Sequence, residues 1–193
     1  AIVLKDENYK KVAVNAMDFI LESLVDEKGR LVKMYRNGIS DKQAVLDDYA
    51  FVIWALIELY HLTFDIKYLI EASNFADYQY EHFWDWDDNG FFFTSDQSEE
   101  LIIRIKEIYD GAIPSANSVS VYNYIRLGRL LSRSDYDEIA YQIVESFGKQ
   151  INRYPKGYSM MLQGIDYLFG PSYEVLIFGD EHNINTINMI NTV

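Results

Sequence analysis

The sequence contains no cysteine, which excludes disulfide bonds and metal sites built on thiolates. Basic side chains are few: 17 lysines and arginines stand against 30 aspartates and glutamates, a net charge of −13. Because nucleic acids repel such a chain and the basic residues form no cluster, we expect no nucleic-acid partner and no polybasic membrane anchor. No run of about 18 uncharged apolar residues is present, so no membrane-spanning helix is expected either.

Sites that rely on histidine or on glycine-rich loops are also lacking. The three histidines, His61, His82 and His182, lie in different parts of the chain without the spacing of a zinc site. No phosphate loop or nucleophile elbow occurs, and the acidic stretch 84–90 lacks the distant glutamate that completes a calcium loop. We therefore predict no metal and no cofactor. The first residues show no signal-peptide pattern, which favours a cytoplasmic protein.

Apolar residues, in contrast, are abundant and recur with a long period. Hydrophobic residues make up 49% of the sequence, which is a globular composition. Phe19, Phe83 and Phe147 are each 64 residues apart (83 − 19 and 147 − 83), and similar units surround them, the third of which, 152–170, is abbreviated. A repeat of this length with two helices predicts a helical solenoid or a closed toroid, because one helix pair cannot bury its own apolar face.

The helices within a unit are of two kinds. Amphipathic stretches, which are typical of outer helices, cover 6–24, 66–83 and 134–151. Residues 50–60 are apolar on all sides except at Glu58, and 118–131 are nearly so, which is typical of enclosed helices. We therefore predict an all-α fold, an α/α toroid (six-hairpin barrel), in which outer helix, loop and inner helix repeat.

The chain is short for a complete toroid of this kind. Six units of 64 residues would need about 384 residues, and the chain has 193. We interpret it as a toroid fragment; an open half-ring and a ring closed by oligomerisation are the alternatives. Residues 1–170 are expected to form the partial barrel and 171–193 a strand–helix tail. The expected partners are the remainder of a longer chain or a second copy that closes the ring.

Short β-compatible runs interrupt the helical pattern. One of them, 29–35, follows a turn in the first loop. Two others, 90–95 and 101–107, are predicted to pair as a small β-hairpin. Residues 173–179 have the pattern of a buried strand, and a short helix is expected to begin at Asp180.

Polar side chains concentrate in the loops that precede the inner helices. Residues 46–50 and 109–118 each lead into a predicted inner helix, and parallel inner helices bring their amino ends to one mouth of the barrel. Exposed N–H groups there suit oxygen-rich ligands, carboxylates can perform acid–base work on a sugar, and aromatic rings can stack on it. A carbohydrate ligand is therefore expected. The predicted catalytic residues are Asp47, Asp48 and Asp110. The predicted substrate-binding residues are Tyr49, Trp84, Trp86, Arg104, Lys106, Ser115, Asn117 and Ser118.

The same residues have a structural alternative. Aspartate and serine at helix starts commonly act as caps, each worth about 1 kcal/mol. Arg104 and Lys106 alternate on a predicted strand and can pair with acidic neighbours instead. The aromatic residues, Trp54 above all, are expected in the core.

Four stretches together resemble a known family. Residues 46–72, 83–95, 104–127 and 170–179 are similar, in this order, to the helical-barrel region of the spermatogenesis-associated protein 20-like family, whose members also carry a thioredoxin-like domain. The resemblance implies a six-hairpin toroid similar in fold to N-acylglucosamine 2-epimerase, cellobiose epimerase and six-hairpin glycosidases, and a sugar as the substrate class.

The sequence departs from this family in several respects. The thioredoxin-like domain, the first hairpin of the barrel and its closing part lie outside this sequence, and Ala116 stands where the family tends to have glycine. Related epimerases use histidines on inner helices, whereas here one histidine, His61, lies on a predicted inner helix. The hypotheses are a sugar isomerase, epimerase or glycoside hydrolase, a non-catalytic scaffold that binds carbohydrate or protein beside a thioredoxin-like domain, and a purely architectural barrel.

Overall fold

The computed structural model describes residues 3–4, 6–37, 39–98, 102–180, 182–190 and 192. Its helices are α1 (Glu7–Ser23), α2 (Leu46–Thr63), α3 (Ile66–Phe83), α4 (Ala116–Leu131), α5 (Ser134–Arg153), α6 (Ser159–Phe169) and α7 (Ile184–Ile190). A β-hairpin of β1 (Val32–Arg36) and β2 (Ile39–Gln43) separates α1 from α2, and a 3-10 turn, η1 (Pro155–Gly157), precedes α6. Among the described residues, no helix combines the length and the apolarity needed to cross a membrane.

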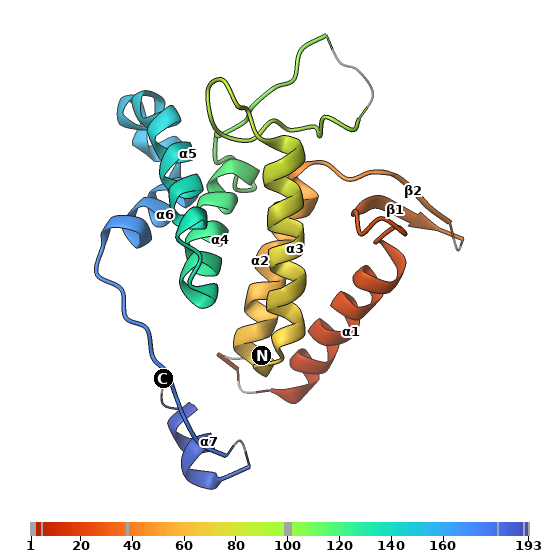
Figure 1. Ribbon diagram of the computed structural model, residues 1–193, viewed down its shortest axis with the longest axis vertical. Coiled ribbons are helices and arrows are strands. Elements are labelled where there is room, and N and C mark those ends of the chain that lie inside the picture. Colours follow the sequence, from red (N-terminus) through yellow and green to blue (C-terminus); the bar gives the residue numbers. More distant parts are fainter. Residues whose placement is uncertain are drawn as a thin grey trace.

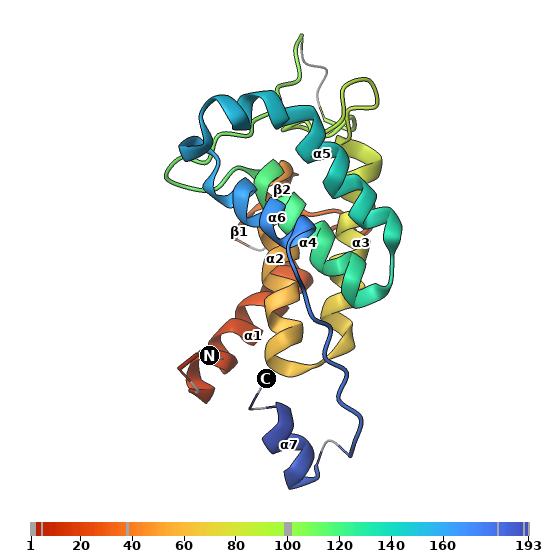
Figure 2. The same cartoon turned by 90° about the vertical axis from the view of Figure 1, so that its left-hand side faces the viewer.

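The helices form two layers (Figure 1). Within the described residues, α2, α4 and α6 make an inner layer, with α4 in contact with both of the others. The outer helices α3 and α5 pack on α2 and α4, and Figure 2 shows the same succession from the side. This alternation is that of a partial α/α toroid, so the predicted fold class is confirmed. The division into a barrel, 1–170, and a tail, 171–193, stays a prediction.

Tight turns join the inner helices to the outer helices that follow them. Phe64 follows the last residue of α2 and Ser132 that of α4, and both C-cap residues are in the left-handed conformation with φ of 55°. A left-handed residue ends a helix abruptly. Asp65 then starts α3 at once, because its side chain accepts a hydrogen bond from the N–H of Lys67 at 3.0 Å. The opposite end of these helices carries the long segment 84–115 (Figure 1).

Buried aromatic and polar groups hold the layers in register. The ring of Tyr124 in α4 stacks on Phe91, and its hydroxyl donates to the carbonyl of Ala76 in α3 at 2.6 Å. Asn123, also in α4, donates to the carbonyl of Ala50 in α2 at 2.8 Å. Because a buried polar group is costly unless it is paired, these bonds fix α4 against both neighbouring helices.

The β-hairpin forms in the first long loop and not in the second. The predicted run 29–35 supplies β1, which pairs antiparallel with β2, for example at Val32 and Gln43. The prediction of a hairpin between 90–95 and 101–107 is wrong over its described part; residue 101 lies outside the described residues.

The second loop uses side chains where a hairpin would use a strand. One backbone bond joins the N–H of Phe93 to the carbonyl of Ile105 at 2.8 Å. Beside it, the guanidinium of Arg104 donates to the carbonyl of Thr94 at 3.1 Å from Nε. The carbonyl of Thr94 thus has a hydrogen-bond donor without an N–H group from a neighbouring strand, so it does not require a regular strand pair.

The tail also differs from its prediction. Residues 173–179 are extended and largely exposed, and within the described part of the chain they pair with no strand. An apolar pattern alone therefore does not form a strand here, because no neighbouring strand among the described residues offers backbone N–H and carbonyl groups to pair with. The last helix begins at Ile184 and not at Asp180, because the side chain of Asn183 caps its first turn by accepting the N–H of Asn185 at 2.9 Å.

Two helical glycines give a matched test of the packing between α4 and α6. A methyl group at Gly164 of α6 would lie 2.7 Å from a carbon of Val121 in α4, whereas at Gly148 of α5 it would meet nothing within 4 Å. We expect Gly164→Ala to lower the free energy of unfolding by about 1–3 kcal/mol through overpacking. Gly148→Ala should raise it by about 0.5–1 kcal/mol. Urea denaturation followed by circular dichroism measures both, and effects of the same sign would contradict this packing.

Candidate functional site

The segment 84–115 brings together the amino ends of the inner helices. The N–H of Leu46, the first residue of α2, donates to the carbonyl of Phe93 at 2.9 Å, and the N–H of Asp110 donates to the carbonyl of Gly157, just before α6, at 2.8 Å. Ser115 caps α4. The two loops in which the sequence places its candidate site therefore meet at one end of the molecule (Figure 1).

Asp110 is the centre of this junction. One carboxylate oxygen accepts the N–H of Ser115 at 2.9 Å, and the other accepts those of Met160 and Met161 at 2.8 and 3.1 Å. First-turn N–H groups have no partner within their own helix, and the positive helix end stabilises a carboxylate. Asp110 is 8% exposed. This geometry favours the structural alternative for Asp110 over the predicted catalytic role.

The predicted binding residues at the start of α4 are buried and occupied as well. The amide of Asn117 accepts the N–H of Phe91 at 2.8 Å and donates to the carbonyls of Phe91 and Glu107 at 3.0 and 2.9 Å. The hydroxyl of Ser115 accepts the N–H of Ser118 at 3.2 Å and donates to its hydroxyl at 2.9 Å. These side chains shape the loop rather than face an open surface.

The two predicted cations hold the same loop together. Lys106 donates to the carboxylate of Asp85 at 2.6 Å. Burial alone would raise the pKa of Asp85, but the bond and charge of Lys106, together with neighbouring N–H groups, outweigh it and lower that pKa. Arg104 donates to the carbonyls of Thr94 and His82.

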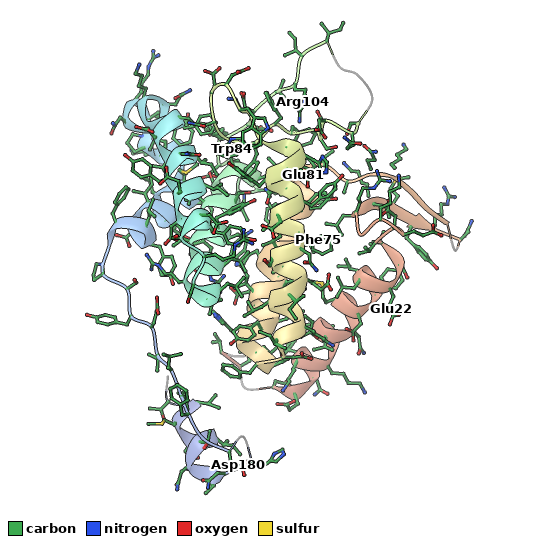
Figure 3. All side chains as sticks on the ribbon, viewed as in Figure 1. Glu22, Phe75, Glu81, Trp84, Arg104 and Asp180 are labelled. Carbon is green, nitrogen blue, oxygen red and sulfur yellow. The ribbon has the colours of Figure 1, made fainter. Side chains whose placement is uncertain are left out.

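The predicted tryptophan platform divides into a buried and an exposed residue. Trp84 is buried edge-on against Phe91. Figure 3 shows Trp84 and Arg104 at the end of α3 from which the loop departs. Trp86 is 68% exposed, but its ring lies 5.2 Å from that of Tyr80 on α3, an outer helix.

Two of the three predicted residues at the start of α2 are also structural. Asp48 accepts the N–H of Val45 at 2.8 Å and so closes the first turn of α2. Tyr49 is buried, its hydroxyl accepts the N–H of Leu31 at 3.0 Å, and its ring stacks on Tyr78. Burial raises the pKa of Tyr49, which keeps the hydroxyl neutral.

Asp47 differs from these residues. It is exposed and, among the described residues, its carboxylate accepts no hydrogen bond. It borders a cavity of about 270 Å³ between α1, β1 and α2, whose lining is mainly apolar. Although Asp47 is exposed as a residue, protein atoms around its carboxyl group partly shield that group from water, which raises its pKa. The charges of Asp48 and Glu107 raise this pKa further, and Lys33 lowers it. A carboxyl group with a raised pKa keeps its proton closer to neutral pH, as a general acid must.

A row of side chains continues from Asp47 along one face of α2. Residues 47, 51, 54, 58 and 61 of α2 are spaced by 4, 3, 4 and 3 positions, which places their side chains within about 80° of arc around the helix axis. We define the inner-helix face as this row and its contacts: Asp47, Phe51, Trp54, Glu58 and His61 of α2, Tyr122 and Arg126 of α4, and Tyr167 of α6. Phe51 stacks on Trp54 with centroids 6.3 Å apart, Trp54 meets Tyr122 at 6.0 Å, and Tyr122 meets Tyr167 at 5.8 Å. Aromatic rings thus cross the inner layer without a break.

An ion pair lies beside this aromatic row. The carboxylate of Glu58 accepts bonds from Arg126 at 2.7 Å and from the indole N–H of Trp54 at 3.1 Å. Arg126 also lies 3.3 Å from Nδ1 of His61. Because a guanidinium donates and does not accept, Nδ1 is the acceptor and the proton of the neutral ring is on Nε2. Burial, followed by the charge of Arg126, lowers the pKa of His61, which agrees with a neutral ring.

Most of this face is missing from the sequence-based predictions. Trp54 was expected in the core and is half-buried, and Tyr122, Arg126 and Tyr167 were not selected, nor was Glu107. One signal was present in the sequence. Glu58 is the single charge in the otherwise apolar stretch 50–60, and a charge in an enclosed helix indicates a polar partner nearby.

Comparison with known proteins identifies distant relatives. No family model matches the chain. Spermatogenesis-associated protein 20 of Rattus norvegicus is 30% identical over 149 residues, which are 77% of this chain and 19% of the rat protein. The Homo sapiens protein of the same name is 27% identical over 201 residues, 99% of this chain and 26% of the human one. This chain is a distant homologue of spermatogenesis-associated protein 20. It spans about a fifth to about a quarter of the length of these relatives, and the resemblance drawn from its residues is confirmed.

Solved structures match the fold. Cellobiose 2-epimerase from Bacillus thermoamylovorans B4167 aligns with a TM-score of 0.68 at 15% identity, over 97% of this chain and 54% of the epimerase. Unsaturated glucuronyl hydrolase from Bacillus sp. GL1 aligns with a TM-score of 0.61 at 16% identity, over 98% of this chain and 55% of the hydrolase. At such identities the likeness shows the fold alone: a six-hairpin α/α toroid, of which this chain covers about half.

Replacing Asp110 tests its structural role. Asp110→Ala leaves N–H groups at the starts of two helices without their acceptor, and we expect the free energy of unfolding to fall by about 3 kcal/mol. The control is Asp87→Ala, an exposed aspartate in the same loop, which should change it by less than about 0.5 kcal/mol. Urea denaturation measures both, and an equally small loss in the two variants would contradict the described junction.

The raised pKa of Asp47 has a measurable effect on stability. The folded chain binds this proton more tightly than the unfolded chain, so the resulting stabilisation is complete below the unfolded pKa and is lost as pH rises through the folded pKa. Asparagine does not ionise. We therefore expect Asp47→Asn to be more stable than the native chain near pH 7 and to lose this advantage near pH 3.

Urea denaturation at the two pH values measures this difference. A matched variant isolates one cause of the shift: Glu107→Gln removes a neighbouring negative charge, so the pKa of Asp47 should fall in an NMR titration of its carboxyl carbon. A stability difference that is the same at both pH values would argue against a raised pKa.

Proposed function

We propose that the inner-helix face binds a carbohydrate and that Asp47 is the proton donor of a toroid of the glycoside-hydrolase kind. One observation carries the proposal. A carboxyl group with a raised pKa stands at the head of an unbroken row of aromatic rings, formed by Phe51, Trp54, Tyr122 and Tyr167, that crosses the inner helices.

The chemistry of this face suits a sugar. Aromatic rings stack on the C–H faces of a pyranose, and a few polar groups orient its hydroxyls. Glu58 and Arg126 supply such groups beside Trp54. The two structural neighbours are, by name, a cellobiose 2-epimerase and an unsaturated glucuronyl hydrolase, so proteins of this fold act on carbohydrates.

The charges favour a neutral saccharide over a uronate. Glu107 places negative charge near the head of the row, and Asp47 adds to it when it is ionised. Further along it, the positive charge of Arg126 is already paired with Glu58 at 2.7 Å. The guanidinium of Arg126 is therefore not free to pair with a sugar carboxylate, which Glu107 would repel. A β-linked neutral disaccharide such as cellobiose is the first ligand to test.

Distance decides between hydrolysis and epimerisation by these residues. Asp47 and His61 are 61 − 47 = 14 residues apart in α2, a rise of about 21 Å along the helix. Epimerisation needs acid and base at the same carbon, so this pair cannot perform it. Protonation of a glycosidic oxygen needs one acid, assisted by a second carboxylate within about 10 Å. Asp47, whose pKa the charge of Glu107 helps to raise, fits the role of that acid.

One observation favours a non-catalytic scaffold as the second candidate. Asp48, the other carboxylate that borders the cavity, is bonded to the N–H of Val45. A face with stacking rings and few free acids would bind a sugar without turning it over, for example beside a thioredoxin-like domain.

Titration of the chain with cellobiose tests the binding face. We expect Trp54→Ala to weaken binding about tenfold, which is about 1.4 kcal/mol, and Trp54→Phe to retain most of the affinity because it keeps a ring. The control is Trp86→Ala, which removes an exposed tryptophan from the region of the outer helix α3. Calorimetry measures each affinity. Equal losses in Trp54→Ala and Trp86→Ala would contradict a site on this face.

Product analysis on the same samples separates the two candidates. For a hydrolase, cleavage falls as pH rises through the pKa of Asp47 and is lost in Asp47→Asn, whereas binding remains. Turnover that survives in Asp47→Asn excludes Asp47 as the donor. Binding without any cleavage by the native chain supports the scaffold.

A further inference from the structure

A second cavity lies on the other side of α2 from Asp47. It has a volume of about 360 Å³ and lies between the turn after α1, the β-hairpin, the first turn of α2, α3 and the segment 84–115. Tyr49, which lines it, follows Asp47 by two residues in α2 and so points about 200° away from it around the helix axis. The cavity has the size of a small-ligand pocket, and no side chain of the inner-helix face lines it.

One part of the lining is aromatic. The rings of Tyr49 and Tyr78 stack with centroids 5.2 Å apart and an interplanar angle of 12°. Phe83 meets Tyr49 at 5.3 Å and Tyr78 at 6.4 Å, in tilted and edge-on contacts. Leu31 and Ala44 add buried apolar surface. Such a lining suits a flat apolar ligand, because aromatic rings gain from stacked and edge-on contacts.

The charged part of the lining favours an anion. Among the described residues that line the cavity, two cations, Arg30 and Lys42, stand against one carboxylate, Asp26. Oδ2 of Asp26 accepts a bond from Nε of Arg30 at 2.8 Å and lies 2.7 Å from Nη2. Within the described part of the chain no acceptor is bonded to Nη1, so the guanidinium keeps a second edge for a ligand. The surplus cation makes the lining locally positive, although the whole chain carries a net charge of −13.

This arrangement differs from that of the arginine on the inner-helix face. Both terminal nitrogens of Arg126 already meet partners, Glu58 and His61. The charge of Arg30, in contrast, acts on the aromatic lining: burial raises the pKa of Tyr78, and Arg30 opposes this rise. The cavity therefore combines a cation and a set of aromatic rings within the reach of one small molecule.

We infer that this cavity is a second ligand site, for a small aromatic carboxylate. The carboxylate binds the Nη1–Nη2 edge of Arg30 in the two-bond geometry that guanidinium groups favour. The ring lies against Tyr78 and Phe83. An anion without a ring leaves the aromatic lining unused, and a ring without a charge forgoes the bonds to Arg30. This inference does not depend on the proposed function.

Calorimetric titration of the chain with three probes tests this chemistry. Benzoate has the ring and the charge, benzamide keeps the ring alone, and acetate keeps the charge alone. We expect benzoate to bind with a dissociation constant below about 1 mM and the other two to bind at least about tenfold more weakly. Equal affinities of benzoate and either other probe would contradict the combined recognition. Failure of benzoate to saturate the chain at about 10 mM, ten times that constant, overturns the inference.

Two arginine variants locate the site. Arg30→Gln removes the guanidinium and should weaken benzoate binding at least about tenfold while leaving benzamide binding unchanged. The matched control, Arg36→Gln, removes the same charge from an exposed position of the same hairpin and should change neither affinity. Equal losses in the two variants would contradict the site. Far-UV circular dichroism verifies that the variants are folded.

A further variant tests the aromatic lining without altering the ion pair. Tyr78→Leu removes one ring and should weaken benzoate and benzamide by the same factor, because both probes use that ring. Unchanged affinities would place the probes elsewhere and overturn the inference.

A competition experiment separates this cavity from the inner-helix face. Trp54→Ala should leave benzoate binding unchanged, and benzoate should not displace cellobiose. Displacement would show that the two ligands share one site, which contradicts a second one. If benzoate binds as expected and cellobiose does not bind, the proposed function fails and this inference stands.

Discussion

The carboxylate of Asp110 is the contact on which this structure depends. Its two oxygens accept N–H groups from the start of α4 and from the start of α6, and so hold two inner helices at a fixed separation. The segment around it does the same for α2 through Phe93. Because first-turn N–H groups are unsatisfied within a helix, a loop that supplies acceptors for three helices determines where those helices begin. The contacts at this end of the molecule therefore set the positions of the inner helices. They also position the row of aromatic rings that these helices carry.

This use of polar groups decides where a ligand can bind. Asn117, Ser115, Arg104 and Lys106 have the chemistry of a sugar site, yet all four are bonded within the loop, which favours a structural role for them. Asp47 keeps a carboxylate at the surface, and the inner-helix face below it keeps half-buried rings. The proposed site is therefore the part of the inner layer that the loop does not occupy.

The period of 64 residues and the two kinds of helix were enough to predict the fold, because both depend on local apolar spacing. The candidate site was less predictable. Glu58 and Arg126 are 68 residues apart and meet only through the packing of α2 on α4, which one sequence does not reveal. The second hairpin was predicted wrongly because the side chain of Arg104 satisfies a carbonyl that a strand would otherwise pair. The pattern at 173–179 lacked the partner strand that its apolar residues require.

Amide hydrogen exchange at the start of α6 tests the central claim most directly. Met160 and Met161 occupy the first turn, where an N–H without a partner exchanges rapidly with water. In this structure both donate to Asp110. The account predicts that their amides exchange as slowly as those of the buried middle of α4. Exchange at the rate of an unstructured peptide would contradict it, since the inner helices would then lack the contact that sets their positions.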